Sequence, residues 1–301
     1  MITRGMQILN EKRYQDILEE NPQDKAQLLH TIGDAYYGQE EYETAIEYYE
    51  EAADTKPESV YFRDWTVAAV RAENLAEAEK ALRAAKGQEI EDGEIRLAQQ
   101  ETAFAKGKLD DVVTIGKELK ESRSKEIAGY SCILSAKAYG RQGNYEKQAE
   151  YLDYAYDLGK DKRCLRELGN TFLEAAEHAE KNKREKYLQK AAGCYEWLKK
   201  EYTVSYRDSM NLAVIRENLG EYEKAEKELK QIARKYSQEY EVYMHLTYVC
   251  LKKQEAQAEK DYSQVLAYFQ KAEKKYHRAG TPEDSAMEEL ENYMEMVKEK
   301  L

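Results

Sequence analysis

Apolar residues recur along the chain with the three- and four-residue spacing of an amphipathic helix. The clearest stretch is residues 28–57, where Gly33 lies on one predicted helix and Ala45 on a second that opens near Tyr42. Pro57 ends the second helix because proline cannot continue one. The stretch therefore predicts a unit of helix, short turn, helix and stop.

The second-helix pattern of this unit returns six more times. The residues that align with Ala45 are Ala78, Val112, Gln148, Ala191, Ala225 and Val265, at steps of 33, 34, 36, 43, 34 and 40 residues. One helix pair cannot bury its apolar face alone, whereas stacked pairs share a continuous core. We therefore expect an all-α solenoid of about seven repeats over residues 26–280.

Two of these steps are long, and the excess lies between the two helices of a unit, at residues 174–190 and 252–262. The first insertion contains neither proline nor glycine. At 3.6 residues per turn, we expect both helices there to grow by about one and a half turns. We expect the second insertion to act likewise to a lesser degree, so that two elongated hairpins project from the array.

The two ends depart from the repeat. Residues 1–25 predict a truncated repeat or a cap, because Pro22 cuts its second helix short, and excision from a longer protein is the alternative. Residues 281–301 predict a capping helix, with a helix-start signal at Thr281 to Asp284. The residues that support these assignments are Gly5, Ile8, Tyr14, Ile17 and Leu18 at the first end and Met287, Leu290, Met294 and Val297 at the second.

This pattern resembles the tetratricopeptide repeat, over about residues 1–275. The first full unit carries nearly all of that family's marker residue types, in Leu29, Ile32, Gly33, Tyr36, Tyr42, Ala45, Tyr49, Ala52 and Pro57. The likeness is weaker at residues 93–119, where Gln100 stands in the slot of Gly33 and Gly116 in that of Tyr49. The resemblance implies a right-handed superhelix of antiparallel helix pairs. It also implies a concave groove lined by first helices, peptide or protein binding, and no catalysis.

Composition excludes several other classes of function. A net charge of −12 opposes binding to nucleic acid and to anionic membranes, both of which require cationic surfaces. The first residues lack the apolar core of a secretory signal, and no apolar run is long enough to span a membrane. The four cysteines are widely spaced, which favours core thiols in a reducing compartment. We therefore expect a cytoplasmic protein.

Catalytic and metal-binding patterns are missing from the sequence. The four histidines are scattered, and none has a second histidine or a cysteine at ligand spacing. Phosphate-binding glycine loops and nucleophile motifs do not occur. Paired glutamates such as Glu40 and Glu41 fit solvated helix faces. We therefore expect no enzyme activity, cofactor or metal.

The resemblance implies which first-helix positions face the groove. The candidate peptide-binding residues are Arg63, Arg71, Phe104, Tyr130, Ile133, Lys137, Arg141, Arg166, Asn170, Met210 and Asn211. Arginine binds carboxylates bidentately, so these cations suit an acidic peptide or a free C-terminus. Alternatively, they pair with glutamates on neighbouring helices. Arg166, Asn170 and Asn211 also resemble part of the family's carboxylate clamp, although Glu241 and His245 stand where its last two cations should be.

The leading hypothesis is therefore a non-enzymatic scaffold whose groove binds an extended acidic or mixed segment of a partner protein. A second hypothesis is a regulatory region of a larger signalling protein, such as a bacterial kinase or transcription regulator. A third is self-assembly through the elongated hairpin at residues 174–190. The sequence does not determine the partner or the oligomeric state.

Overall fold

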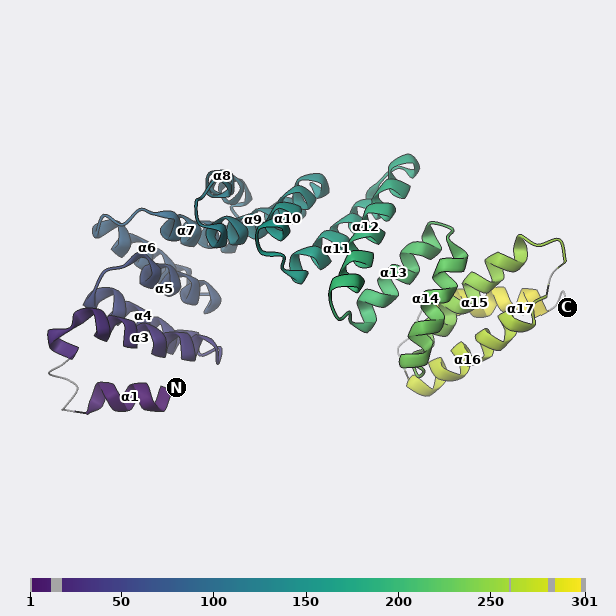
Figure 1. Ribbon diagram of the computed structural model, residues 1–301, viewed down its shortest axis with the longest axis horizontal. Helices are drawn as coiled ribbons and strands as arrows, with labels where there is room; N and C mark the ends of the chain where they lie inside the picture. The colour runs from purple at the N-terminus through teal and green to yellow at the C-terminus, as the bar shows by residue number, and fades with distance from the viewer. Residues whose placement is uncertain (1, 12–17, 260, 281–284, 299–301) are drawn as a thin grey trace. The chain divides into compact units, whose positions relative to one another are not determined.

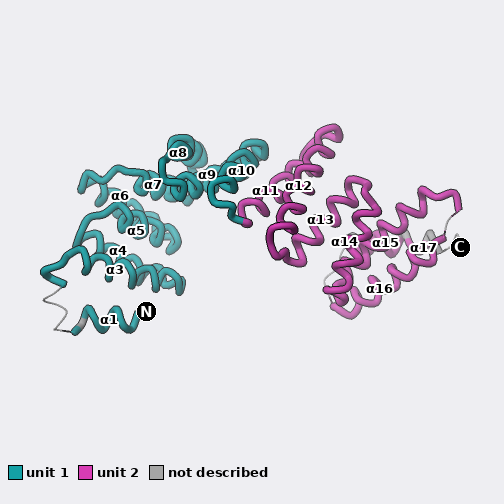
Figure 2. The backbone as a smooth tube through the Cα atoms, in the orientation of Figure 1, with its two compact units in different colours: residues 1–161 teal, residues 162–301 magenta. Residues whose placement is uncertain are grey.

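The computed structural model describes residues 2–11, 18–259, 261–280 and 285–298. Within these ranges every regular element is a helix (Figure 1). The chain forms two compact units, residues 1–161 and residues 162–301 (Figure 2). Each unit is a row of helix pairs joined by short connections, and each pair packs against the next in its unit. The predicted all-α solenoid of stacked helix pairs is confirmed.

Unit 1 holds the first four full pairs. Its first helices α5, α7 and α9 contact one another in sequence, so they form one side of the unit. The helices are α1 (Ile2–Asn10), α3 (Pro22–Tyr37), α4 (Tyr42–Thr55), α5 (Ser59–Arg71), α6 (Leu75–Gly87), α7 (Gly93–Ala105), α8 (Leu109–Lys120), α9 (Lys125–Arg141) and α10 (Tyr145–Gly159).

Unit 2 holds three further pairs and a last helix. The helices are α11 (Lys162–His178), α12 (Lys181–Glu201), α13 (Tyr206–Asn218), α14 (Tyr222–Lys235), α15 (Tyr240–Glu255), α16 (Ser263–Ala279) and α17 (Ser285–Lys298). Met287, Leu290 and Met294 of α17 are buried in one core with α15 and α16. The predicted start signal at Thr281 to Asp284, the predicted N-terminal residues Tyr14 and Ile17, and the side chain of Val297 lie outside the described residues.

The repeat spacing read from the sequence coincides with the buried core. Of the seven residues in the Ala45 slot, six have no exposed surface. The seventh, Gln148, is half-buried and packs beneath Gly140, where an added Cβ would meet its side chain at 2.8 Å. Small residues recur in this slot because the two helices of a pair approach closely there.

The small slot on a first helix is matched in size by a residue on the second helix. A Cβ on Gly33 would meet the Tyr49 ring at 2.6 Å, and one on Gly169 would meet the Tyr195 ring at 2.9 Å. In the pair α7–α8 the sizes are exchanged, since Gln100 is large and Gly116 is small. The Gln100 amide fills the space, donating to the Val112 carbonyl at 3.0 Å and the Ser135 hydroxyl at 3.0 Å. The weak third repeat therefore preserves the packed volume with the roles reversed.

Five tight connections between paired helices share one backbone device. Two residues before the second helix starts, the chain adopts a left-handed conformation, with φ between 58° and 73°. Glycine accepts this conformation without a steric penalty, and it occurs at Gly107, Gly143 and Gly220. Glu40 and Glu73 adopt it at the cost of Cβ strain.

The two inserted stretches differ in form. At residues 174–190, α11 runs nine residues beyond Gly169 and α12 begins ten before Ala191, whereas α3 and α4 extend only four beyond Gly33 and three before Ala45. At residues 252–262, α15 continues to Glu255 but α16 begins only at Ser263. The second helix of that pair is therefore not lengthened at its start, contrary to the expectation, because residues 256–259 form a connection instead.

No helix among the described residues combines the length and the apolar character needed to cross a membrane. The four cysteines are free thiols, of which Cys132, Cys164 and Cys250 are buried. Burial raises the pKa of both the Cys132 and the Cys250 thiol to about 11.

Candidate functional site

The first helices of unit 1 line a hollow of about 410 Å³. Its sides come from α3, α5, α7 and α9, with Tyr49 added from α4. On α3, α5 and α7 most of the lining residues are three or four positions apart, which places them on one face of each helix. Arg63, Arg71 and Tyr130 of the predicted set line it. The complete lining is His30, Asp34, Tyr37, Tyr49, Arg63, Asp64, Val67, Arg71, Leu97, Glu101 and Tyr130.

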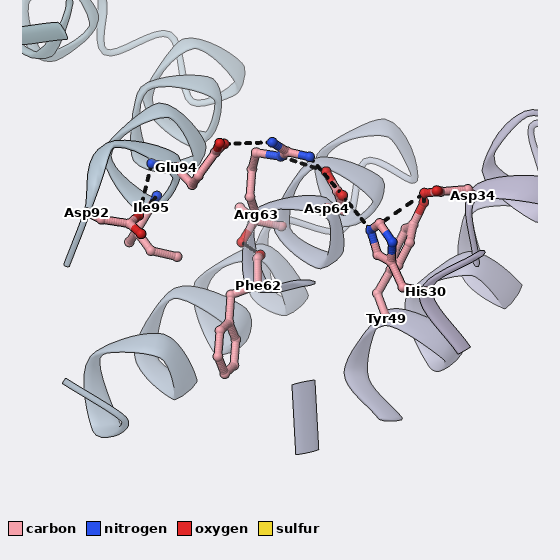
Figure 3. Close-up of polar contacts among 10 residues, drawn as sticks. His30, Asp34, Tyr49, Phe62, Arg63, Asp64, Asp92, Glu94 and Ile95 are labelled. Atoms are coloured by element: carbon pink, nitrogen blue, oxygen red, sulfur yellow. Dashed lines mark hydrogen bonds and ion pairs between the residues drawn. The ribbon is translucent and has the colours of Figure 1, made fainter. Parts of the chain in front are cut away.

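Arg63 is held between two carboxylates on one side of the hollow (Figure 3). It donates to Asp64 on its own helix at 2.7 Å and to Glu94 on α7 at 2.6 Å. His30 adds a contact from α3, with its Nε2 2.7 Å from the Asp64 Oδ2. Burial raises the pKa of the Asp64 carboxyl, but hydrogen bonds with His30 and Arg63 outweigh it and hold the pKa below its usual value. The alternative of intramolecular pairing therefore applies to Arg63.

A metal ion could be considered at this network. Ligand atoms of His30, Asp34 and Asp64 lie within 4.8 Å of one another. However, both Asp64 oxygens receive hydrogen bonds from Arg63, and the Tyr49 hydroxyl donates to Asp34 at 2.8 Å. A cation would have to displace the guanidinium, so the cluster is better described as an internally satisfied network. Nothing in the sequence pointed to this network, because His30 and Asp64 are 34 residues apart.

The other side of the hollow carries less compensated positive charge. Arg71 of α5 and Lys137 of α9 both lie near Glu101 of α7, and both act to lower the pKa of that carboxyl. Burial nevertheless dominates and raises the Glu101 pKa above its ordinary value. One half-buried carboxylate therefore faces two exposed cations.

A stripe on α9 continues this side. Tyr130, Ile133, Lys137 and Arg141 follow one another at three- and four-residue spacing, and Tyr130 is 62% exposed. The Arg141 guanidinium lies 4.1 Å from the ring centre of Phe104 on α7, a cation–π contact. In the described part of the chain, neither Arg71, Lys137 nor Arg141 has a carboxylate within 4.0 Å. We call Arg71, Lys137 and Arg141 the cation triplet.

In unit 2, three predicted site residues are engaged within the fold. Arg166 donates to both oxygens of Asp208 on α13, at 2.6 and 2.9 Å. The Tyr195 hydroxyl donates to Asn170 at 2.5 Å and accepts from Asn211 at 2.8 Å. These side chains stabilise the junction of α11, α12 and α13, and Arg166 is already paired with a carboxylate.

Asp208 explains why Arg166 is held so firmly. Its side chain is only 3% exposed, and it forms a capping box with Ser205 at the start of α13. Burial raises the pKa of the Asp208 carboxyl, but hydrogen bonds from Arg166 and Ser205 outweigh burial and lower it. Sequence reasoning missed Asp208 because it lies outside the positions taken as groove-facing.

Met210, one of the predicted groove residues, is buried rather than exposed. Met210 is 6% exposed and belongs to the core of unit 2. It shares its repeat position with Leu97, which is also buried, and with Arg63 and Arg166, which reach the surface. The position lies at the margin of the core, so the apolar Leu97 and Met210 are largely covered there, whereas a long charged side chain extends to water.

Glu241 and His245, at the last two positions of the family's carboxylate clamp, also contact other side chains of unit 2. Glu241 accepts a hydrogen bond from the Tyr206 hydroxyl at 3.1 Å, and the His245 Nδ1 lies 2.9 Å from Glu217. The second cation pair of the family's carboxylate clamp is therefore replaced by internal contacts. The partial likeness at Arg166, Asn170 and Asn211 does not extend to the whole clamp.

Comparison with known families matches residues 26–59 to the tetratricopeptide repeat. Comparison with curated proteins gives no match. Among solved structures, the chain is similar to PilF of Pseudomonas aeruginosa, with 11% identity, 72% of this chain and 94% of that one covered, and a TM-score of 0.54.

Two further solved structures share the fold. One is a signal-transduction ATPase with numerous domains and a tetratricopeptide repeat sensor, from Pyrococcus horikoshii. It has 19% identity and a TM-score of 0.55; 90% of this chain is covered, but this chain spans only 46% of that one. The other is PilW, a type IV pilus biogenesis factor, with 14% identity, 70% and 94% coverage and a TM-score of 0.50. Likeness at these identities shows the fold alone. Residues 26–59 therefore match the tetratricopeptide repeat, and the helix-pair fold of both units is the fold of tetratricopeptide repeat proteins.

Proposed function

We propose that the hollow of unit 1, together with the α9 stripe, binds an extended segment of a partner protein that carries acidic and apolar side chains. Tetratricopeptide repeats generally mediate protein–protein interaction, and their fold is generally a non-enzymatic scaffold. The observation that carries the proposal is the cation triplet. Two of its members, Arg71 and Lys137, lie near one carboxylate, Glu101, and Arg71 lines the hollow together with the exposed Tyr130.

The charge arrangement selects the acidic character of the segment. Arg63 contributes little to binding because Asp64 and Glu94 already neutralise it. Arg71, Lys137 and Arg141 retain donors for an incoming carboxylate, and arginine offers two parallel N–H groups to it. The chain has a net charge of −12, but salt screens charges that lie more than about 10 Å from the bound segment. The nearby cations therefore dominate the electrostatic interaction at the contact.

The apolar character of the segment follows from the lining. Tyr37, Val67 and Tyr130 present apolar surface to the hollow, and Tyr130 supplies a large ring with a polar tip. Such aromatic side chains are the usual anchors of protein interfaces. A segment that alternates acidic and apolar side chains would therefore contact the cations and the hollow together.

The experiment is a selection of displayed random 12-residue peptides on the purified chain, followed by calorimetry of the enriched peptides. We expect enriched peptides to be acidic and their affinity to fall as salt rises. Arg71→Glu/Arg141→Glu should weaken binding at least about tenfold, and the neutral Arg71→Gln/Arg141→Gln should weaken it less. Lys227→Glu/Arg234→Glu on α14 is the control, since it makes the same charge change at exposed residues of unit 2.

Circular dichroism of each variant verifies that the helices are retained. Enriched peptides without acidic residues, or an unchanged affinity in Arg71→Glu/Arg141→Glu, would overturn the proposal.

The second hypothesis, a regulatory region of a larger signalling protein, remains a proposal supported by the shared fold with the ATPase that has a tetratricopeptide repeat sensor. It predicts that the reading frame encoding this chain also encodes an effector domain. Sequencing of the full transcript decides this, and a frame without such a domain rejects it.

A further inference from the structure

The hairpin of α11 and α12 extends beyond the usual length of a repeat in this chain (Figure 1). Ala175, Ala176 and Leu188 are buried along its seam, and Phe172 stacks on Tyr187 with ring centres 6.4 Å apart. Packed residues therefore continue into the extension, which makes it a formed part of the structure.

The end of this hairpin carries its two signs of charge on separate helices. The α12 flank presents exposed Lys181, Lys183, Arg184 and Lys186 with one acidic residue among them. The α11 flank and the connection present exposed glutamates, Glu174, Glu177 and Glu180. Among the described residues, no ion pair within 4.0 Å joins the basic flank to the acidic flank.

Most charges at the hairpin end oppose the helix dipoles. The first turn of α12 has cations and no acidic residue, although Glu180 stands at its N-cap without a side-chain cap hydrogen bond. The negative C-terminal end of α11 has Glu174 and Glu177 near its last residue, His178. Charges of these signs at these ends destabilise a helix, so the arrangement disfavours the isolated hairpin. Contact with complementary charges would reduce the unfavourable electrostatic energy at the start of α12 and at the end of α11 together.

We infer that this hairpin end docks on the same hairpin end of a second copy of the chain. A purely acidic ligand would meet the basic flank but would be repelled by Glu174, Glu177 and Glu180. A fitting partner must carry both signs side by side, and a second copy related by a two-fold axis does so. The acidic flank of each copy then faces the basic flank of the other, as a self-complementary interface requires.

The contact is small and mostly charged, so it is weak and sensitive to salt. It is also separate from the proposed peptide site, because it lies in unit 2 and uses none of the hollow's residues. Failure of either proposal therefore leaves the other standing.

The test is a charge exchange followed by sedimentation velocity of the full chain over a concentration series at low and high salt. Lys183→Glu/Arg184→Glu makes the whole end acidic, and Glu174→Lys/Glu177→Lys makes it basic. We expect the wild-type chain to self-associate at low salt and to dissociate at high salt. Each variant alone should associate at least about tenfold more weakly, because like charges then face each other. An equimolar mixture of the two variants should form a heterodimer.

Lys227→Glu/Arg234→Glu again makes a matched charge change elsewhere in unit 2 and should associate like the wild type. Thermal unfolding supplies a second readout. Lys183→Glu/Arg184→Glu should melt at or above the wild-type temperature, because it corrects the charge at the start of α12. A wild-type chain that stays monomeric at low salt, or a mixture that fails to associate, would overturn the inference.

Discussion

The close approach of Gly33 to Tyr49 makes Gly33→Ala an informative substitution. Alanine in place of glycine inside an unrestrained helix stabilises it by about 0.8–1 kcal/mol. Here the new Cβ would lie 2.6 Å from the Tyr49 Cε1 and 2.8 Å from its Cδ1. The ring cannot swing aside easily, because it is 2% exposed and its hydroxyl donates to Asp34.

Overpacking of this kind costs about 1–3 kcal/mol. Because it opposes the gain in helix propensity, we expect a net loss of about 1 kcal/mol in the free energy of unfolding. Gly129→Ala is the matched control, since Gly129 also lies inside a first helix of unit 1 but has nothing within 4 Å of an added Cβ. It should stabilise the chain by about 0.8–1 kcal/mol.

Another repeat of the chain indicates the rescue. The pair α13–α14 places Ala213 and Leu229 in the two slots, and both are fully buried. In the Tyr49→Leu background, Gly33→Ala should therefore become neutral or stabilising. Urea unfolding of the four members of this cycle should yield a coupling of about 1–3 kcal/mol. If Gly33→Ala stabilised the chain as much as Gly129→Ala in both backgrounds, the size-matching explanation would be refuted.

Three further predictions concern buried polar groups and thiols. Gln100→Glu would place a carboxylate against two backbone carbonyls at 3.0 and 3.2 Å, so urea unfolding at pH 7 should show a loss of about 3 kcal/mol; an unchanged midpoint would contradict this. The Asp208 carboxyl has a lower pKa in the folded chain than its value of about 4 in the unfolded chain. Its pairing with Arg166 therefore stabilises the fold above about pH 4, and this stabilisation is lost as the pH falls through the pKa of the folded state. Asp208→Asn should therefore flatten the acid limb of a plot of melting temperature against pH, and an unaltered limb would count against the assignment. The Cys132 and Cys250 thiols, with pKa values raised to about 11, should react with a disulfide reagent at pH 8 only after unfolding, so rapid labelling of either in the native chain would disprove their burial.

Much of the fold was accessible from the sequence because the repeat fixes the phase of its core. Once Ala45 defined the slot, a fully buried residue in each of five further second helices followed without knowledge of the structure. The exchange of sizes at Gln100 and Gly116 was visible only as a departure from the pattern. Its meaning required the structure, because Gln100 bonds to α8 and to Ser135 on α9, which is 35 residues away.

The site was predictable in position more than in charge. The family resemblance placed Arg71 and Tyr130 at groove-facing positions, and both line the hollow. The resemblance could not show that Arg63 and Arg166 are paired, because Asp64 and Asp208, which accept their hydrogen bonds, lie outside the positions taken as groove-facing. Nor could the resemblance show that Met210 is buried whereas Arg63 and Arg166, at the same repeat position, reach the surface.

The central claim is that a partner segment lies in the hollow of unit 1. A photoreactive benzoylphenylalanine at position 130 would report this contact directly, because Tyr130 is exposed and lines the hollow. The same group at position 227, which is exposed on α14, is the reference. We predict that an enriched acidic peptide crosslinks from position 130 and loses that crosslink at high salt or with Arg71→Glu/Arg141→Glu. Equal crosslinking from position 227, or none from position 130 while calorimetry still shows binding, would contradict the account.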